Sequence, residues 1–298
     1  MQTQLRQAVV VAFGRTPYCK ARKGSFAQLH PVEYGAQTLL GVLARVPQLR
    51  PEDIGDVIMG CAMPFGVQGG NMARLIVQRA GLPDCVTAQT VNRYCSSGLQ
   101  TIATAANAIR CGEEDVVIAG GVESMSLVPM LVGAEDADPW LAEHRPEVYT
   151  TMGITAENVA RQWGISRADM DAMAVESHRR AAQAQAGGCF DGQIIPITVP
   201  GPDGGEVVVC RDEGIRPGTT AETLAGLKPC FLENGSVTAA TSSQMTDGAG
   251  FVVLMSEEKA AELGVKPLAR FVSFATGGVP AEVMGVGPIE AVPKALRK

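Results

Sequence analysis

The sequence predicts an α/β fold whose central sheet is at least partly parallel. An apolar run at 86–91 is followed by an Ala-rich helical pattern over 99–109 and by a second apolar run, DVVIAGG, at 115–121. A strand, a crossover helix and another strand form a βαβ unit, whose two strands are parallel. The chain has 298 residues, 46% of them hydrophobic and 19% charged. That is enough for one large core or two ordinary ones.

Apolar periodicity and turn residues divide the first 122 residues into short elements. Pro31 suits a first helical turn, and Gly81 and Gly112 suit helix ends. The helix over 99–109 has Leu99 and Ile109 on one apolar face and alanines around its sides, so we expect it to be buried nearly all round. The expected order is a strand at 7–13, a helix at 31–46, a strand at 54–61, a helix at 72–80, a strand at 86–91, the helix at 99–109 and the strand at 115–121.

The character of the sequence changes after residue 122. Helical stretches at 155–163 and 167–186 alternate with Gly- and Pro-rich turns, which indicates an excursion from the α/β core. Core elements return as a strand at 251–255 and a helix at 256–263. A further strand is expected at 268–275, and an amphipathic helix at 289–298. Because 269–275 echoes 7–13, we expect a duplicated fold whose second copy begins near residue 268.

Composition excludes several functional classes. The net charge is −6 and no long basic run occurs, so nucleic acid is not expected as the main partner. The apolar run AVVVAF at 8–13 is far too short to cross a bilayer, and the N-terminus lacks a signal-peptide layout. We therefore expect a cytoplasmic protein without a membrane partner. The eight cysteines show no zinc spacing, so no metal site is expected, and most should be reduced core residues.

Cys95 is the strongest candidate for chemistry. It stands in VNRYCSSGLQ (91–100), where a strand turns into a helix. Unpaired N–H groups and the positive end of the helix dipole favour the thiolate at such a place. The pattern therefore indicates a nucleophile.

These residues carry a resemblance to thiolases. The segments NRYCSSGLQ (92–100) and AGGVESMS (119–126) resemble the thiolase active-site region. Three further stretches are similar as well: MGITAEN (152–158), NGSVTA (234–239) running on to DGA (247–249), and MGVGP (284–288). The similarity runs in unbroken order from Gln7 to Lys298, which is more specific than any short motif.

The resemblance implies a layered α-β-α thiolase-like fold and thiolytic cleavage of a 3-ketoacyl-CoA by CoA. CoA is then a co-substrate, with no permanently bound cofactor, and the chain is a homodimer or homotetramer. Cys95 is the implied nucleophile. The implied CoA contacts are Ser243 with pantetheine, Met152 in the acyl or pantetheine pocket, and Arg216 and Thr223 at the adenine and phosphate end. The chain departs from the family at Ala240-Thr241, where Gly-Asn is usual.

The resemblance also implies catalytic groups that the 298 residues do not contain. In thiolases the general base lies in a Gly-His-Pro segment, the acid/base cysteine in Cys-x-Gly-x-Gly, and a water-positioning asparagine in Asn-Glu-Ala-Phe. None of the three histidines here, His30, His144 and His178, has such a context. We therefore expect impaired turnover. The alternative is a non-catalytic remnant that binds CoA or thiolase subunits, and a ketoacyl-synthase-like enzyme is a weaker third reading, disfavoured by 234–249.

The implied organisation has three parts. Residues 1–122 and 240–267 form an N-terminal α/β core domain, 123–239 form an inserted loop domain, and 268–298 begin a truncated C-terminal domain. The segment RTPYCKARKG (15–24) is more similar to degradative 3-ketoacyl-CoA thiolases than to biosynthetic ones. It indicates a place in fatty acid β-oxidation.

Overall fold

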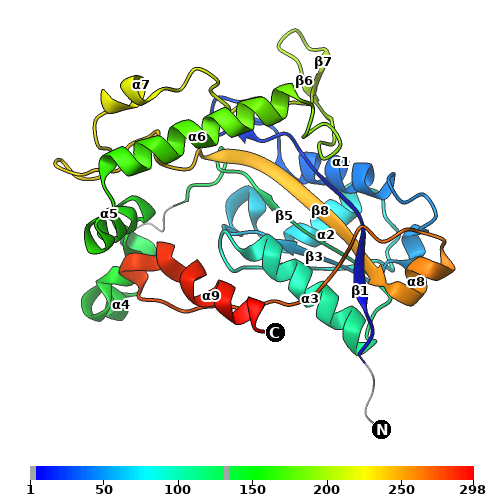
Figure 1. Ribbon diagram of the computed structural model, residues 1–298. Coiled ribbons are helices and arrows are strands. Elements are labelled where there is room, and N and C mark those ends of the chain that lie inside the picture. The colour runs from blue at the N-terminus through cyan, green and yellow to red at the C-terminus, as the bar shows by residue number, and fades with distance from the viewer. Residues whose placement is uncertain (1–4, 131–133) are drawn as a thin grey trace. The chain divides into compact units, whose positions relative to one another are not determined.

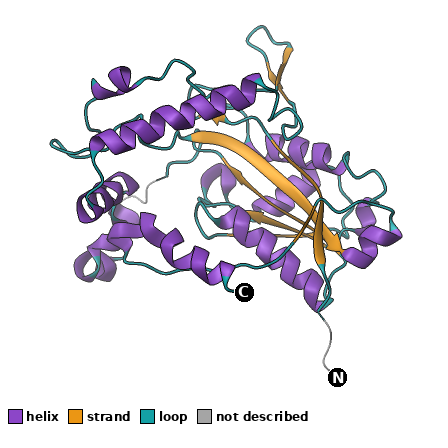
Figure 2. Ribbon diagram, viewed as in Figure 1, coloured by secondary structure: helices purple, strands orange, loops and turns teal. Residues whose placement is uncertain are grey.

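The computed structural model describes residues 5–130 and 134–298. The chain divides into two compact units. The first, here called the sheet unit, comprises Met1–Pro129, Phe190–Gly214 and Met245–Val272. The second, the helical unit, comprises Met130–Cys189, Ile215–Gln244 and Ser273–Lys298. Figure 1 labels the elements of both units, and Figure 2 separates helices from strands by colour.

Most strands of the sheet unit belong to one mixed sheet in the order β4-β3-β5-β8-β1-β9, with β2 paired to β8. β3 is parallel to both β4 and β5, which confirms the predicted βαβ unit, whereas β8 is antiparallel to β5 and β1. The strands of the unit are β1 (Ala8–Arg15), β2 (Cys19–Lys20), β3 (Asp56–Gly60), β4 (Thr87–Val91), β5 (Val116–Glu123), β8 (Thr246–Ser256) and β9 (Ala269–Arg270), and a separate hairpin of β6 (Ile197–Pro200) and β7 (Glu206–Val209).

The two faces of the sheet support two different hydrophobic cores, because successive strand side chains point to opposite sides. On one face Ile58, Val117 and Leu254 pack with α3 (Ser97–Cys111). On the other face their chain neighbours pack with α1 (Pro31–Leu43) and α2 (Met72–Arg79). α8 (Glu257–Glu262) follows β8 directly. Helices therefore cover both faces of the sheet, and the predicted layered α-β-α fold is confirmed (Figure 1).

The helical unit is built from α4 (Pro139–His144), α5 (Met152–Trp163), α6 (Arg167–Ala186), α7 (Ala221–Ala225), the 3₁₀ helix η5 (Ala281–Val286) and α9 (Gly287–Leu296). α6 has the bounds that the sequence predicts, and Ser166 caps it: its hydroxyl accepts from the Asp169 N–H while the Asp169 carboxylate accepts from Ser166. α5 packs on η5, where the Asn158 side-chain amide donates to the Glu282 carbonyl at 3.0 Å.

The structure divides the chain at other points than the predicted domain boundaries. The segment Phe190–Gly214 belongs to the sheet unit, because the Arg15 guanidinium donates to both carboxylate oxygens of Asp212 at 2.7 and 2.9 Å. The Arg15 N–H also donates to the Gln193 carbonyl, and the Arg15 carbonyl accepts from the Ile195 N–H. The division into 1–122 with 240–267, 123–239 and 268–298 stays a prediction.

Three expectations were wrong in detail. The strand at 268–275 shrinks to β9, two exposed residues that pair only with β1 at the sheet edge. Leu99 is 60% exposed, because Ser97 and Thr101 are the residues of this turn of α3 that are buried against the sheet, and Leu99 lies on the opposite side of the helix. The cysteines are not mostly core residues: Cys19 and Cys61 are buried, whereas the other six are exposed, namely Cys85, Cys95, Cys111, Cys189, Cys210 and Cys230.

Within the described ranges 5–130 and 134–298, no helix combines the length and apolarity that crossing a bilayer requires.

Candidate active site

Cys95 lies in the short connection between β4, which ends at Val91, and α3, which begins at Ser97. The side chain is exposed and the thiol is free. β4 and β3 are parallel, so this connection leaves the sheet at the carboxyl ends of both strands. Crevices at that edge are where open α/β sheets bind ligands. The position that the sequence predicts for the nucleophile is therefore accessible.

The start of α3 differs from the simple picture of a row of unpaired N–H groups. Ser96 is the N-cap residue, but its side chain accepts no hydrogen bond from the helix. The Ser96 and Ser97 N–H groups instead donate to the carbonyls of Arg93 and Tyr94, at 3.2 and 3.0 Å. These two N–H groups are therefore not available to the Cys95 thiol. The remaining N–H groups of the first turn and the dipole of the whole helix are still near it.

α3 approaches the sheet unusually closely, and glycines make this possible. A Cβ built on Gly60 at the end of β3 would lie 2.5 Å from the Ser97 Cβ and 2.8 Å from the Ser97 carbonyl carbon. The Thr101 hydroxyl lies one turn further along and is within hydrogen-bond distance of the Gly98 carbonyl (2.8 Å) and the Gly120 carbonyl of β5 (3.0 Å). The height of the helix start above the sheet, and hence of Cys95, is fixed by these contacts.

A buried polar cluster supports the loops beside the Cys95 connection. Glu123 ends β5 and accepts from the Ala62 N–H at 2.7 Å and from the Gln68 side-chain amide at 2.8 Å. Asp247 is fully buried and accepts from the Ser126 N–H at 2.9 Å. Sequence reasoning missed both carboxylates as site residues. The available signal was an acidic residue directly after an apolar strand, and a second one inside the thiolase-like DGA segment.

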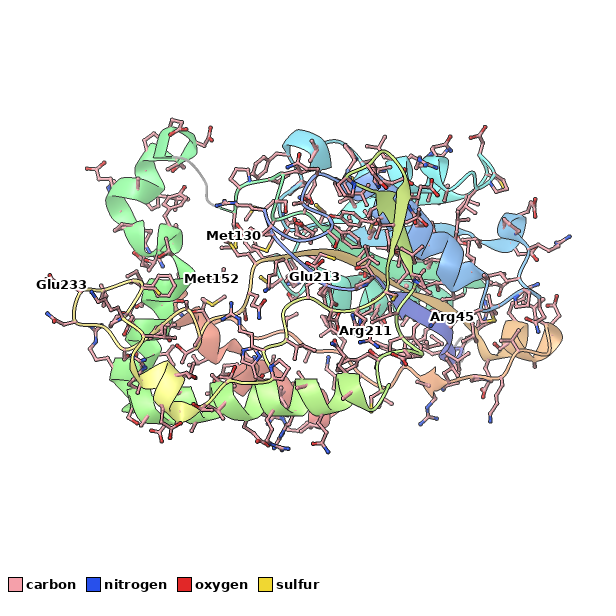
Figure 3. All side chains as sticks on the ribbon, turned by 90° about the horizontal axis from the view of Figure 1, so that it is seen from above. Arg45, Met130, Met152, Arg211, Glu213 and Glu233 are labelled. Atoms are coloured by element: carbon pink, nitrogen blue, oxygen red, sulfur yellow. The ribbon has the colours of Figure 1, made fainter. Side chains whose placement is uncertain are left out.

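A second pair of carboxylates, both partly buried, fixes the loop after β1. Besides Asp212, Glu213 accepts from the Lys20 and Ser25 N–H groups at 3.0 Å each, and Figure 3 labels its side chain. Burial raises the pKa of Glu213, but the hydrogen bonds from Ser25 and Lys20 outweigh it and leave the pKa below its ordinary value. The basic segment 15–24 is therefore held in place by acidic partners in the same unit.

The four implied CoA contacts all belong to the helical unit, whereas Cys95 belongs to the sheet unit. Met152 opens α5 and is 42% exposed (Figure 3). Ser243 is exposed, just past a turn in which the Thr238 carbonyl accepts from the Ser242 hydroxyl at 2.8 Å. Arg216 is exposed, and among the described residues its guanidinium has no ion-pair partner. Thr223 lies in a capping box with Thr220, where its hydroxyl donates to the Thr220 carbonyl at 2.8 Å.

Glu157 joins two of the thiolase-like segments. It is 7% exposed on α5 and accepts from the Val237 N–H at 2.8 Å, the Ser236 N–H at 2.9 Å and the Ser236 hydroxyl at 2.9 Å. Burial raises the pKa of this carboxyl, but those hydrogen bonds outweigh it, so the pKa is lowered. A Cβ on Gly235 would lie 2.3 Å from the Glu157 Oε1, so only glycine leaves room for the carboxylate.

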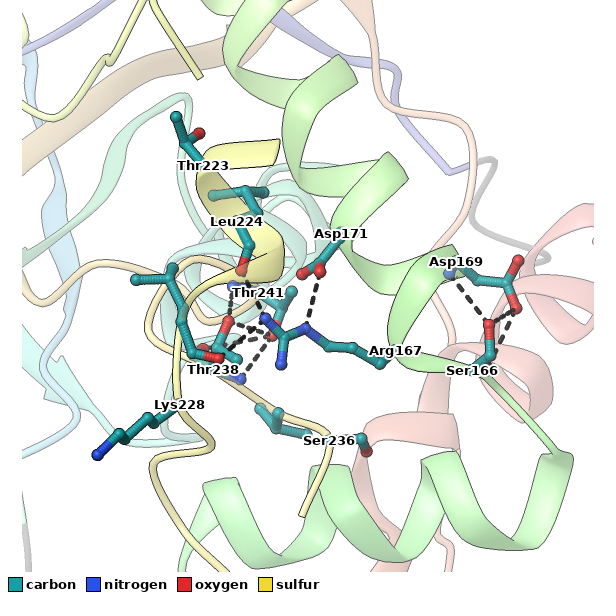
Figure 4. A network of polar contacts seen from close by, with 12 residues as sticks. Ser166, Arg167, Asp169, Asp171, Thr223, Leu224, Lys228, Ser236, Thr238 and Thr241 are labelled. Carbon is teal, nitrogen blue, oxygen red and sulfur yellow. Dashed lines mark hydrogen bonds and ion pairs between the residues drawn. The ribbon is translucent and has the colours of Figure 1, made fainter. Parts of the chain in front are cut away.

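α7 and the loop after it are held by one arginine of α6 (Figure 4). The Arg167 guanidinium donates to Asp171 at 2.8 Å and to the carbonyls of Leu224 and Leu227 at 2.6 and 3.1 Å. The segment that carries Arg216 and Thr223 is also linked to α6 through the Arg216 N–H, which donates to the His178 Nδ1 at 3.3 Å. His178 is thus occupied by a structural contact.

No group of three or more His, Cys, Asp or Glu side chains arranged to hold a metal ion occurs among the residues that the structure describes.

Comparisons with known proteins identify the family. The thiolase N-terminal domain family matches residues 8–258. The chain belongs to the thiolase family.

Curated relatives agree over nearly the whole chain. A 3-ketoacyl-CoA thiolase from Bacillus subtilis is 50% identical over 301 residues, covering 98% of this chain and 77% of the relative. A peroxisomal 3-ketoacyl-CoA thiolase A from Mus musculus is 43% identical, covering all of this chain and 71% of the relative. Among solved structures, the acetyl-CoA acetyltransferase of Bacillus anthracis matches with a TM-score of 0.90 and 38% identity over 99% of this chain and 77% of that one. The resemblance read from the sequence is therefore confirmed.

Proposed function

We propose that this chain transfers acyl groups between 3-ketoacyl-CoA and CoA through an acyl-enzyme on Cys95. The observation that carries the proposal is the exposed Cys95 thiol at the β4–α3 junction, within the part of the chain that the thiolase domain matches. Family membership supports the enzyme class, acetyl-CoA C-acyltransferase, and the names of the relatives from Bacillus subtilis and mouse support the substrate class. Those names also support a role in fatty acid β-oxidation.

The proposed reaction has two half-reactions. In the first, the Cys95 thiolate attacks the 3-keto carbon, a carbon–sulfur bond forms, and the bond between C2 and C3 of the substrate breaks. The electron pair leaves on C2 of an acetyl-CoA enolate, which takes up a proton to give acetyl-CoA. In the second, the CoA thiol attacks the acyl-enzyme, releasing the shortened acyl-CoA and returning the proton and the thiol of Cys95. No permanently bound cofactor is needed.

The oxygen of the attacked carbonyl becomes negatively charged in the transition state and needs donors. The Cys95 N–H, at the start of α3, is our candidate for one of them. The positive end of the α3 dipole favours the negative charge that develops on this oxygen.

CoA is proposed to contact Ser243, Met152, Arg216 and Thr223. The exposure of all four residues is consistent with ligand contact. Arg216 is chemically the best suited, because its guanidinium has no ion-pair partner among the described residues and can bind a phosphate or stack on an adenine. Thr223 is the weakest member, because its hydroxyl already donates to the Thr220 carbonyl.

For a polypeptide of these 298 residues we expect acylation without efficient turnover. The three histidines lie outside the Gly-His-Pro context of the family base, and His178 accepts the Arg216 N–H. The alternative proposal is a CoA-binding or subunit-binding thiolase chain without catalysis. It predicts CoA binding but no acyl-enzyme.

The proposed partner besides acyl-CoA and CoA is a second copy of the chain, in a homodimer or homotetramer. β4 ends the sheet and, among the described strands, pairs only with β3. An open strand edge is a template for pairing with another chain. A cytoplasmic location stays a prediction, since the relatives include bacterial enzymes and a peroxisomal mouse enzyme.

Acetyl-CoA labelling tests the proposal. Incubation with acetyl-CoA should add one acetyl group, located on Cys95 by peptide mass spectrometry, and Cys95→Ser should abolish it. Cys111→Ser, which removes an exposed thiol at the other end of α3, is the matched control and should label normally. Equal labelling of the Cys95→Ser protein contradicts the proposal. Binding of CoA without labelling of the unsubstituted protein supports the non-catalytic alternative.

A further inference from the structure

Tyr94, the residue directly before Cys95, has a backbone conformation that tyrosine rarely adopts. Its φ is +47°, and among the described non-glycine residues only Arg22 also has a positive φ. The side chain is 67% exposed, so packing of the ring does not impose this conformation. A residue held against its preference needs support from its surroundings, and such residues concentrate at functional sites.

The support comes from hydrogen bonds on both sides of the Tyr94 backbone. Its N–H donates to the Asn92 Oδ1 at 2.8 Å, which is the Asx turn that asparagine forms with the residue two positions on. Its carbonyl accepts from the Ser97 hydroxyl at 2.6 Å and from the Ser97 N–H at 3.0 Å. Ser97 is buried against Gly60 and cannot move away.

Asn92 is in turn tied to the buried polar cluster. Its side-chain Nδ2 donates to the Ala62 carbonyl at 3.0 Å, and the Ala62 N–H donates to the Glu123 carboxylate at 2.7 Å. The Asn92 amide thus has one donor bond to the loop after β3 and one acceptor bond to Tyr94. An unbroken path of hydrogen bonds runs from the end of β5 to the residue that precedes the nucleophile.

We propose that Asn92 is a positioning residue that holds Tyr94 in its left-handed conformation and thereby directs the Cys95 thiol, with Glu123 as its anchor. The proposal rests on the proposed role of Cys95. A rotation of the backbone at Tyr94 also moves the Cα and the N–H of Cys95. Loss of the Asx turn lets Tyr94 relax to an ordinary negative φ, which moves both the nucleophile and the oxyanion donor.

The test compares Asn92→Ala with the double substitution Asn92→Ala/Tyr94→Gly. Asn92→Ala should slow acetylation of Cys95 by acetyl-CoA by roughly 10- to 100-fold, because displacement of a reacting group by about 1 Å has that effect. Alkylation of the same thiol by iodoacetamide needs only an accessible thiolate and should change little. Glycine adopts positive φ without support, so Tyr94→Gly should restore most of the lost acetylation rate.

Asn107→Ala is the matched control, because Asn107 is an exposed asparagine of α3 and should leave both rates unchanged. An unchanged acetylation rate in Asn92→Ala overturns the proposal. So does a double variant that is no faster than the single one.

Amide exchange at Tyr94 provides a readout that does not depend on acylation. The chain has four tyrosines, so selective ¹⁵N-tyrosine labelling gives few signals, and the Tyr94 signal is the one that Tyr94→Gly removes. Exchange of the Tyr94 N–H should be slow in the unsubstituted protein and faster in Asn92→Ala. If Asn92→Ala unfolds, Asn92→Asp, which keeps the acceptor oxygen, should retain slow exchange. Equal exchange in the unsubstituted protein and Asn92→Ala, or fast exchange in Asn92→Asp, overturns the inference. If the unsubstituted protein is not acetylated, the proposed function fails, and the amide signal still decides this inference.

Discussion

At the residue scale, the environment of each cysteine separates exposed thiols from thiols that pack in the core. Burial, together with the charge of Glu123, raises the pKa of Cys61 to about 12. Burial and the charge of Glu213 raise the pKa of Cys19 further still. Both thiols are therefore protonated and inaccessible at neutral pH. Cys95 is exposed, and it alone of the eight stands at the start of a helix that follows a strand of the main sheet.

Glu157 gives the clearest pH dependence. Its folded pKa lies below the ordinary value of about 4.3, so its hydrogen bonds stabilise the fold fully above that value and are lost as pH falls through the folded pKa. Glu157→Gln should lower the free energy of unfolding by roughly 1–3 kcal/mol at pH 7, because a carboxylate with three donors is replaced by a neutral amide. Thermal unfolding between pH 7 and pH 3 measures the difference between the two proteins.

The difference between the Glu157→Gln and unsubstituted proteins should shrink below about pH 4.3. Glu233→Gln, at an exposed glutamate of the same unit, is the control and should leave unfolding unchanged. A constant difference across the whole pH range would show that shape, and not ionisation, explains the loss.

At the element scale, the position of α3 against the sheet depends on Gly60. Gly60→Ala should destabilise the fold by roughly 1–3 kcal/mol, because the new methyl group meets the helix backbone and not a flexible side-chain end. It should also slow acetylation of Cys95, since α3 has to shift. Chemical denaturation and acetyl-CoA labelling measure the two effects.

Gly98→Ala is the matched control, because it adds the same methyl group to α3 itself. There the nearest atom, the Gly120 carbonyl oxygen, lies 4.0 Å from the added Cβ. We expect unchanged or slightly raised stability. Equal destabilisation by both substitutions would mean that the close approach at Gly60 is not what limits packing.

At the scale of the whole molecule, the open edge of the sheet decides what a second copy can do. β4 leads directly to Cys95, so pairing between copies along β4 would also immobilise the segment that carries Cys95. We predict a homodimer or homotetramer, with a mass of two or four times 31.2 kDa in light scattering. Hydrogen exchange at residues 87–91 should slow as protein concentration rises. A monomer at micromolar concentration, or exchange at 87–91 that is independent of concentration, contradicts this prediction.

The sequence alone determined the α/β class, the βαβ unit, α6 and the place of Cys95 between a strand and a helix. These depend on local periodicity, caps and glycine positions, which a sequence displays directly. The thiolase resemblance was equally visible, because it rests on the order of several segments. The exposure of individual side chains was harder to predict from the sequence. Leu99 and six cysteines are apolar or weakly polar residues whose burial depends on which neighbours cover them.

Only the tertiary structure decided how the site is supported. Glu123 and Ala62 are 61 residues apart in sequence, and Glu157 and Ser236 are 79 apart, so no local pattern predicts their hydrogen bonds. The left-handed conformation of Tyr94 is held by nearby residues, but those residues are themselves fixed by partners that are distant in the sequence. Asn92, which accepts from the Tyr94 N–H, donates to the Ala62 carbonyl, and Ser97, which donates to the Tyr94 carbonyl, packs against Gly60. The sequence placed Cys95 between a strand and a helix, and long-range packing holds the backbone that precedes it.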